Sequence, residues 1–198
     1  MKDSKLWKIY WWGNHRDDEL IRYLEMDSRL KDITKPGLFG RGFQKANQKY
    51  ESKWLREYEE LPAKKFQRYG ILDRGWLVEV PQKVERRGVR EVYEGSRLLI
   101  KRGITEKTFP KGKIIARIER DRFSFRHSIY GVKLVQKKEW HYKCILGILW
   151  SSLARYYFFL TSSAWGGVAS RNSRGRVTGF ADTISPKRGF EERNIRTC

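Results

Sequence analysis

Arginine and glutamine in a short glycine-containing segment are the residues whose chemistry is easiest to interpret in this chain. Phe39–Gln44 reads FGRGFQ and carries Arg41 and Gln44 on a backbone loosened by Gly40 and Gly42. Arg and Gln side chains can each make two hydrogen bonds to one base edge, Arg to guanine and Gln to adenine. The segment is therefore a candidate for reading bases, and we expect its two glycines to serve a bend or a close backbone approach rather than a phosphate.

Two later segments also combine cations with a strand-like pattern. Leu98–Gly103 (LLIKRG) ends an apolar strand in Lys101 and Arg102, which we interpret as a phosphate clamp or a base contact. Arg117–His127 (RIERDRFSFRH) interleaves cations with phenylalanines, which suits a strand laid against a duplex backbone. Its candidate DNA-binding residues are Arg120, Arg122, Arg126 and His127. For every residue named here, a solvated basic surface without sequence information is the alternative interpretation.

The net charge indicates a polyanionic partner. The 198 residues are enough for one domain with a real core, and they carry 43 Lys and Arg against 23 Asp and Glu, a formal net charge of +20. This excess is spread along the whole chain. Nucleic acid is the first expected partner and an anionic membrane the second. No stretch separates a basic face from an apolar one as a membrane-surface helix requires, so the sequence favours nucleic acid.

Catalytic signatures are incomplete in this sequence. The five prolines are never adjacent, which excludes the Asp/Asn-Pro-Pro-aromatic motif that holds a flipped base in amino-methylating DNA methyltransferases. No glycine-rich loop opens a helix after a strand, so no cradle for a nucleotide or for S-adenosylmethionine is predicted. The three histidines and two cysteines lack metal-ligand spacing. Asp32 with Glu51-Ser52-Lys53 only faintly imitates a metal-dependent nuclease, a coincidence expected in so charged a chain.

The sequence predicts neither secretion nor membrane insertion. The N-terminus, MKDSKLWKIYWWG, has no apolar core long enough for a signal peptide. The apolar stretch Tyr142–Thr161 is too short and too polar for a membrane span. Within it, Cys144 is expected to be a small buried hydrophobe, and two cysteines do not make a disulfide framework. We therefore expect a soluble, cytoplasmic protein.

Hydrophobic patterning predicts an α+β fold, with a mixed or antiparallel sheet of short strands backed by helices and one long C-terminal helix. The expected strands are Leu6–Trp12, Trp76–Val80, Val89–Tyr93, Arg97–Lys101, Lys113–Ile118, Phe123–Phe125 and Ile129–Leu134. The expected helices are His15–Met26, Ser52–Glu60 and Tyr142–Thr161, and a turn is expected at Pro36-Gly37. Residues 168–198 show no period of either kind and are rich in Arg, Ser and Gly, so we expect them to be disordered.

Five segments of the chain occur in the order found in a known family. They are WKIYWWGNHRDDELIRYL, GRGFQ, YEGSRLLIKRGI, the FSFR…IYGVKL strands and ILGILWSSLARYYFFLTSSAWG, which together cover about residues 5–166. In these segments the chain resembles the C-terminal target-recognition half of adenine-N6 DNA methyltransferases, the TaqI-like specificity domain. That domain occurs in single-chain restriction–modification enzymes and in the methylases of BREX-type phage defence. One departure is Leu149-Trp150-Ser151, where the family usually reads Leu-Asn-Ser.

The resemblance implies a DNA target-recognition domain over residues 1–167 that binds double-stranded DNA and reads a few base edges. It also implies a partner, a methyltransferase catalytic domain or subunit that holds S-adenosylmethionine and methylates a flipped adenine. This chain carries neither motif set, so we expect no methyltransferase activity from it alone. A non-specific RNA- or single-stranded-DNA-binding basic protein, which stacks bases on exposed aromatics, is the alternative. A nuclease is a third candidate with poorer residues.

The family pattern also makes a prediction about residues 168–198. In such proteins Trp165-Gly166 is expected to be followed by an acidic segment resembling EIHVEELLDLPIP. Permissible codons for Val168–Ser185, read one nucleotide later, can spell SRREIHVEELLDLPIPF. We therefore expect residues 168–198 to be the frameshifted end of a truncated gene. The nucleotide sequence checks this: if no alternative frame spells the acidic segment, the hypothesis is wrong.

Overall fold

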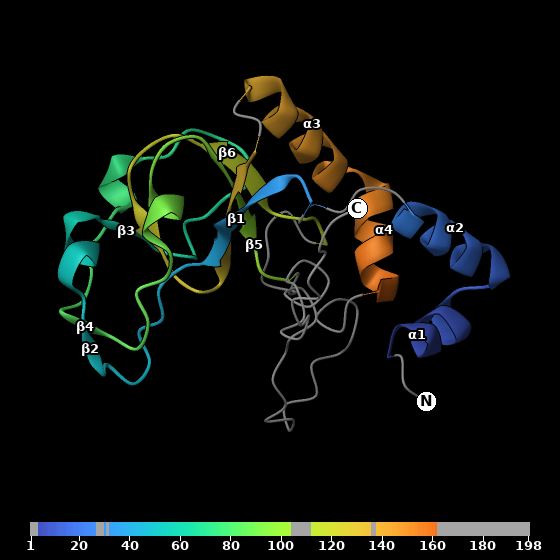
Figure 1. Ribbon diagram of the computed structural model, residues 1–198, viewed down its shortest axis with the longest axis horizontal. Helices are drawn as coiled ribbons and strands as arrows, with labels where there is room; N and C mark the ends of the chain where they lie inside the picture. Colours follow the sequence, from blue (N-terminus) through green and yellow to red (C-terminus); the bar gives the residue numbers. More distant parts are fainter. Residues whose placement is uncertain (1–3, 27–29, 31, 104–111, 136–137, 162–198) are drawn as a thin grey trace, which may run out of the picture.

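A four-stranded antiparallel sheet forms the centre of the protein. The computed structural model describes residues 4–26, 30, 32–103, 112–135 and 138–161 (Figure 1), so the segment expected to be disordered, 168–198, lies outside the described residues. The sheet order is β1-β8-β5-β6, and every neighbouring pair in it is antiparallel. The α+β fold class with an antiparallel sheet is confirmed. Its strands are β1 (Thr34–Arg41), β5 (Arg97–Lys101), β6 (Ala116–Glu119) and β8 (Ile129–Leu134).

The two middle strands, β5 and β8, have the predicted bounds and are buried on both faces. Leu98 and Ile100 of β5 pack into the core cluster beneath the helices, whereas Leu99 faces the opposite cluster. In β8, Gly131 lies where a Cβ atom would be 2.7 Å from the Val92 Cβ. Only glycine fits this position, which explains the glycine at the centre of an otherwise apolar strand.

Short elements cover the other face of the sheet and hold the larger core cluster. They are β2 (Tyr50–Glu51) paired with β4 (Lys83–Val84), β3 (Glu60–Leu61) paired with β7 (Ser124–Phe125), and the 3-10 turns η1 (Lys53–Glu57), η2 (Arg74–Trp76) and η3 (Arg90–Tyr93). The predicted Val89–Tyr93 strand is wrong because Val92 and Tyr93 point into the core from a 3-10 turn instead of pairing. The predicted Trp76–Val80 strand is also wrong: η2 ends at Trp76, and only an isolated bridge joins Val78 to Glu60. The predicted Ser52–Glu60 helix is a 3-10 turn, η1.

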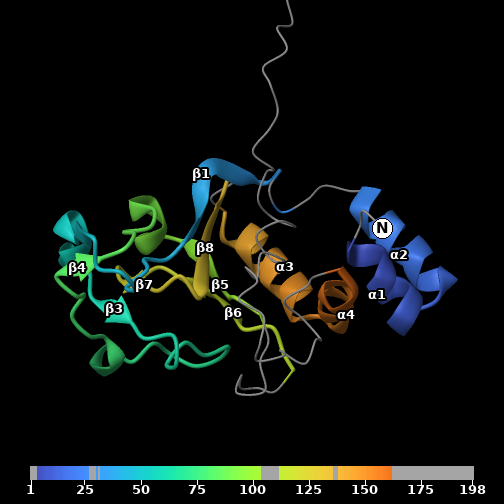
Figure 2. The same ribbon diagram turned by 90° about the horizontal axis from the view of Figure 1, so that it is seen from below.

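The described residues include four α-helices, which lie on the side of the sheet opposite these short elements. They are α1 (Ser4–Trp12), α2 (His15–Met26), α3 (Glu139–Trp150) and α4 (Ser152–Thr161). Figures 1 and 2 show α3 and α4 beside the sheet, with α1 and α2 beyond α4. The α2 prediction is confirmed at the same bounds. Within the strand expected over Leu6–Trp12, the chain is helical instead, because Ile9 packs against Ile21 and Leu160, and these tertiary contacts override the strand preference of aromatic residues.

The predicted turn at Pro36-Gly37 lies inside β1, so this prediction is wrong. The register with β8 shifts between Thr34 and Phe39, which absorbs the residues that carry the turn signal.

The predicted long C-terminal helix is present as two helices that meet at Ser151 with a bend of 64°. Ser151 is extended (φ −69°, ψ 157°), and its Oγ accepts a hydrogen bond of 3.1 Å from the Ala154 amide, capping α4. Trp150 fixes the end of α3, because its Nε1 donates to the Ala116 carbonyl of β6 at 3.0 Å. Within the described residues, neither helix alone is long and apolar enough to cross a membrane, although the bent pair together reaches that length and composition.

Cys144 lies on the exposed side of α3, contrary to the prediction that it is buried. The cause is the orientation of α3: Tyr142 and Leu149 are buried in the core, Ile145 and Leu146 pack against it, and Cys144 lies outside this stripe.

Two glycines, one in close contact with backbone atoms and one facing open space, provide a test of this packing. At Gly42, an added Cβ would lie 1.9 Å from the Phe125 carbonyl oxygen, so we expect Gly42→Ala to destabilise the protein by roughly 3 kcal/mol or more. At Gly147, inside α3, an added Cβ meets nothing within 4 Å, so Gly147→Ala should stabilise by about 0.5–1 kcal/mol. Urea unfolding followed by tryptophan fluorescence measures both. A Gly42→Ala midpoint equal to that of the natural protein would contradict the packing described.

Candidate nucleic-acid interface

Three of the predicted site residues meet at one edge of the central sheet. Arg41 ends β1 and pairs with Tyr130, near the start of β8, and Tyr130 pairs in turn with Ile100 of β5. Because these strands are antiparallel, the C-terminal ends of β1 and β5 lie beside the N-terminal end of β8. Arg102 follows β5 and His127 precedes β8, so both belong to this same edge.

His127 is the centre of a cationic cluster at this edge. Its half-buried ring has a lowered pKa, first because burial disfavours the charged imidazolium and then because Arg102, Arg86, Arg41 and Arg126 repel it. The ring is therefore neutral near pH 7. Its Nδ1 atom is buried without a hydrogen-bond partner among the described residues.

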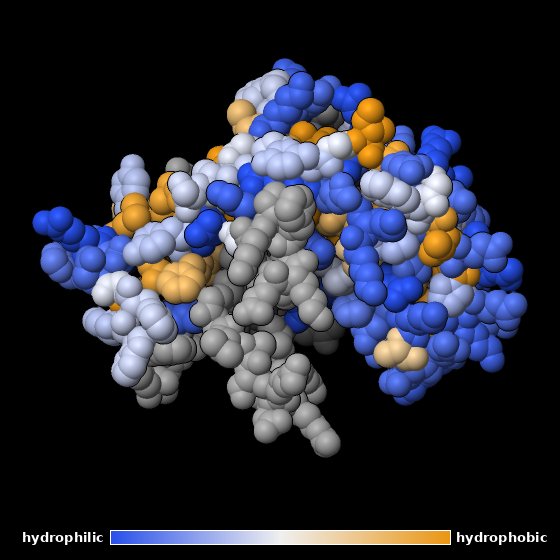
Figure 3. Space-filling view, turned by 180° about the vertical axis from the view of Figure 1, so that it is seen from behind, coloured by the Kyte–Doolittle hydropathy of each residue, from blue (hydrophilic) through white to orange (hydrophobic). Residues whose placement is uncertain are grey.

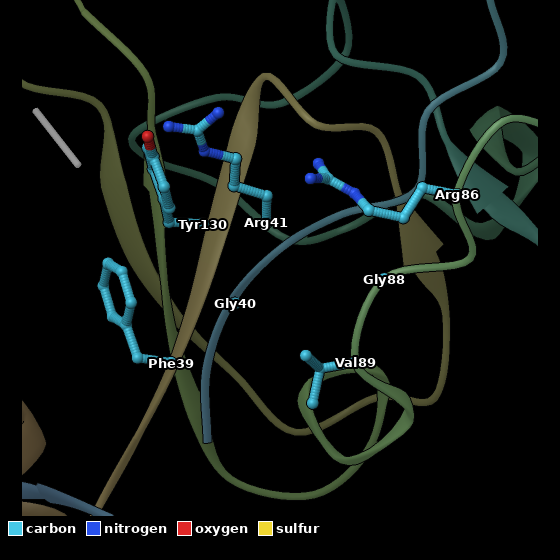
Figure 4. A pocket seen from close by; sticks show the side chains of 7 residues that line it. All are labelled: Phe39, Gly40, Arg41, Arg86, Gly88, Val89 and Tyr130. Carbon is cyan, nitrogen blue, oxygen red and sulfur yellow. The ribbon is translucent and has the colours of Figure 1, made fainter. Parts of the chain in front are cut away.

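A pocket of about 340 Å³ opens beside this cluster. Its lining residues are Phe39, Gly40, Arg41, Arg86, Gly88, Val89 and Tyr130. In Figure 4, Arg41 and Arg86 extend along the same side of the pocket, and Phe39 and Val89 lie across from them. Phe39 stacks on Tyr130 with ring centroids 5.4 Å apart, and the Arg41 guanidinium lies 5.6 Å from the Tyr130 centroid. The pocket thus combines two cations with an apolar and aromatic wall.

The backbone forms part of the pocket because two glycines allow close approach. A Cβ at Gly40 would lie 2.8 Å from the Val89 Cγ2, and Gly88 has a φ of +80° with its Cβ position 2.3 Å from the Tyr93 hydroxyl oxygen. The expectation that Gly40 and Gly42 serve close backbone approach is confirmed. This approach brings the segment carrying Arg86 against the end of β1.

The arginines that line the pocket differ in their partners from the arginines predicted in Arg117–His127. No carboxylate of the described residues lies within ion-pair distance of Arg41 or Arg86. By contrast, the three arginines predicted from Arg117–His127 all pair with glutamates: Arg120 with Glu139, Arg122 with Glu57 at 3.0 Å, and Arg126 with Glu60. Pairing reduces the field that a cation offers to a phosphate, so Arg41 and Arg86 are the stronger candidates.

Some cations of this segment and its neighbours serve the fold itself. Arg126 reaches Glu60 with both Nε and Nη2, and the Glu60 side chain is only 1% exposed against 41% for Arg126. Arg97 is fully buried, with its guanidinium 4.6 Å from the Phe123 ring centroid, and burial lowers the pKa of Arg97 to about 10. Phe123 and Phe125 are fully buried. Only the cations of the Arg117–His127 segment, and not its phenylalanines, can therefore contact a DNA duplex.

The remaining predicted residues lie near the cluster with different surroundings. The Gln44 side chain donates from Nε2 to Glu85 Oε2 at 2.9 Å, and the Gln44 backbone N–H donates to the Arg86 carbonyl at 2.8 Å. Gln44 therefore helps to place Arg86. Lys101 ends β5, and partial burial lowers the pKa of its ammonium group. It does not belong to the cations that act on His127.

Sequence reasoning missed Arg86 and Tyr130. Arg86 lies between the predicted strands Trp76–Val80 and Val89–Tyr93, in a segment for which the sequence analysis names no site residue, although Arg86-Arg87-Gly88 repeats the arginine–glycine pairing of Arg41-Gly42. Tyr130 is hidden in an apolar strand, and no sequence signal separates it from an ordinary core residue.

The described residues contain no group of three or more His, Cys, Asp or Glu side chains able to hold a metal ion. Among these residues the pocket lining also has no carboxylate for ribose hydroxyls, and its two cations would repel the sulfonium of S-adenosylmethionine, so this pocket does not fit that cofactor. No protein-family model matches the chain, and no curated protein or solved structure shows significant similarity to it. The interpretation of the site therefore depends on its own geometry and chemistry.

The Arg126–Glu60 pair allows a test that separates structural from binding cations. Arg126→Ala would leave the Glu60 carboxylate buried without its partner, so we expect a loss of about 3 kcal/mol in the free energy of unfolding. The same substitution in a Glu60→Gln background should cost about 1 kcal/mol or less, since no buried charge is then stranded. Denaturant unfolding of the four proteins measures the coupling. Equal losses in both backgrounds would contradict the structural role.

Proposed function

We propose that this chain is a sequence-specific double-stranded DNA recognition module of a site-specific adenine-N6 DNA methyltransferase, in restriction–modification or phage defence. The observation that carries the proposal is the gathering of Arg41 and Arg86, neither paired with a carboxylate of the described residues, around His127 at one sheet edge. A net charge of +20 is consistent with a polyanion but does not locate its site. The division of the arginines by their partners supports this location.

In this proposal the residues have two kinds of role. Arg86 and the Lys101-Arg102 segment bind backbone phosphates, which supply affinity without sequence information. Arg41 and Gln44 read base edges. Arg41 is held over the Tyr130 ring and Gln44 is held by Glu85, so both side chains are oriented before DNA arrives. Such preorganisation lowers the entropy cost of binding and narrows the range of accepted sequences.

The methylation chemistry belongs to a partner in this proposal. A catalytic domain or subunit holds S-adenosylmethionine and flips the target adenine, while this chain positions the duplex in the cytoplasm. The poor fit of the pocket to S-adenosylmethionine supports this division.

A second candidate function is non-specific binding of single-stranded DNA or RNA. Its supporting observation is the exposure of three consecutive aromatics of α1, Tyr10 (71%), Trp11 (75%) and Trp12 (59%), on which unpaired bases could stack. On the face seen in Figure 3, hydrophobic residues occur as small separated groups among hydrophilic ones. Competition between single- and double-stranded oligonucleotides distinguishes the two functions, because only the second candidate requires equal or better affinity for single strands.

Salt titration of DNA binding tests the proposal with a charge-matched control. We expect Arg41→Ala with Arg86→Ala to weaken duplex binding and to lower the slope of log K against log salt by about one for each phosphate that is no longer neutralised. The control, Arg120→Ala with Arg122→Ala, removes the same charge from glutamate-paired arginines and should change the slope little. Fluorescence anisotropy with a labelled duplex measures both.

The outcomes of this titration are distinct. Equal effects of the two double variants would mean that binding follows net charge alone, which contradicts the assigned interface. Repeating the titration on duplexes of different sequence separates the two kinds of role. Arg41→Ala or Gln44→Ala should relax the sequence preference, whereas Lys101→Ala with Arg102→Ala should weaken binding to every duplex.

A further inference from the structure

His127 has a surrounding that the proposed recognition function does not explain. His127 is half-buried at the sheet edge, where its backbone N–H donates to the Phe43 carbonyl and the Arg102 backbone N–H donates to the Ser128 carbonyl, both at 2.8 Å. Four arginines from four separate segments of the chain repel the charged form of the His127 ring. Its Nδ1 is buried without a hydrogen-bond partner in the described part of the chain, which leaves Nε2 as the nitrogen through which the ring can meet a ligand. A buried polar atom without a partner costs stability, so a function of this arrangement is worth seeking.

We propose that Arg86, Arg102 and His127 form a binding site for one phosphate group, and that His127 takes up a proton when the phosphate binds. The inference rests on the proposed function in one respect: the phosphate is then a backbone phosphate of the recognised DNA.

Charge balance at the site supports proton uptake. The charged groups that act electrostatically on His127 are Arg102 after β5, Arg86 after β4, Arg41 at the end of β1 and the adjacent Arg126. Arg126 is compensated by the Glu60 carboxylate of β3. The Glu85 side chain, next to Arg86 in the sequence, accepts from Gln44. Without a ligand, the charges that lower the pKa of His127 are those of arginines, so the field at the imidazole is positive and opposes protonation.

A bound phosphate reverses that field. Its negative charge offsets the arginines, and an oxygen near Nε2 stabilises the imidazolium by a charge-assisted hydrogen bond. The added proton in turn strengthens phosphate binding, because the two equilibria are linked. Arginines alone cannot do this, since a guanidinium stays protonated at every physiological pH.

The sign of the pH dependence follows from this linkage. In the free protein, the pKa of His127 lies below its ordinary value, and in the complex it is raised. Between these two pKa values the complex holds one more proton than the free protein. Affinity therefore increases as pH falls through this interval, by at most about tenfold per pH unit for one proton. Above the upper pKa and below the lower one, this contribution is constant.

Nuclear magnetic resonance of the histidine rings tests the proposal directly in the full chain. The three imidazole pKa values are measured in chloride, in sulfate at the same ionic strength, and with a mixed-sequence DNA duplex. Sulfate is a tetrahedral dianion that does not titrate in this range, so it represents the phosphate alone. We expect sulfate and the duplex to raise the pKa of His127. His15 and His141, which lie on other elements, serve as internal controls.

A substitution tests the effect on affinity. Duplex affinity at constant salt is measured at pH 6, 7 and 8 for the natural protein, His127→Gln and His15→Gln. Glutamine keeps a polar side chain but cannot take up a proton in this range. We expect the pH dependence to disappear in His127→Gln and to persist in His15→Gln, whose histidine is exposed on α2.

The outcomes separate this inference from the proposed function. If the duplex binds but the pKa of His127 does not rise, the inference is overturned and the recognition function stands. If the duplex fails to bind while sulfate raises this pKa, the phosphate site is supported and the DNA function fails. If neither ligand moves the ring, the site is not a phosphate site. A pH dependence that persists in His127→Gln would also overturn the inference.

Discussion

The close contact of two glycines with Phe125 is the constraint on which the candidate interface depends. The Gly42 backbone lies against the Phe125 carbonyl, and Gly131 lies beneath the tip of the Phe125 ring. A Cβ at either position would push β7 away from the sheet. Arg41 precedes the first glycine and Arg126-His127 follow Phe125, so the contact that closes the core also sets the spacing of the cations. Site and core are therefore parts of one packing arrangement.

Arginine has two physical uses in this molecule, and its partners distinguish them. Arg97 and Arg126 stabilise the interior, one over an aromatic ring and one against a buried carboxylate. Arg41 and Arg86 have no such carboxylate among the described residues and border a pocket instead. A high net positive charge therefore does not locate the binding site of a polyanion. The positions of the glutamates help to locate it, because arginines paired with glutamates offer a weaker field to a phosphate.

Sequence patterns predicted the elements whose burial is simple. The runs RLLIK and IYGVKL are buried on both faces, and α2 has acidic residues in its first turn, so all three have their predicted bounds. The patterns failed where tertiary contacts decide. The aromatic residues of α1 favour a strand locally, but the packing of Ile9 beside Leu160 makes this segment helical. Ser151 caps α4, yet a serine inside an apolar helical pattern does not by itself predict a break. Arg41 and His127 could be predicted from the sequence as candidate DNA-binding residues. Their proximity to Arg86 could not be predicted, because it depends on the register of the sheet.

The docking of α1 and α2 on α4 has a consequence for how the chain reaches its folded state on the ribosome. The Lys8 ammonium donates to the Phe159 carbonyl across 151 residues of sequence, and Tyr156 and Tyr157 donate to Asp17 and Glu25 over comparable spans. Helices α1 and α2 therefore cannot complete their packing until α4, the last described helix, has been synthesised. Contacts of such long range form slowly. During translation, the aromatic side chains of α1 therefore stay exposed while the residues between α1 and α4 are synthesised, which favours chaperone binding there.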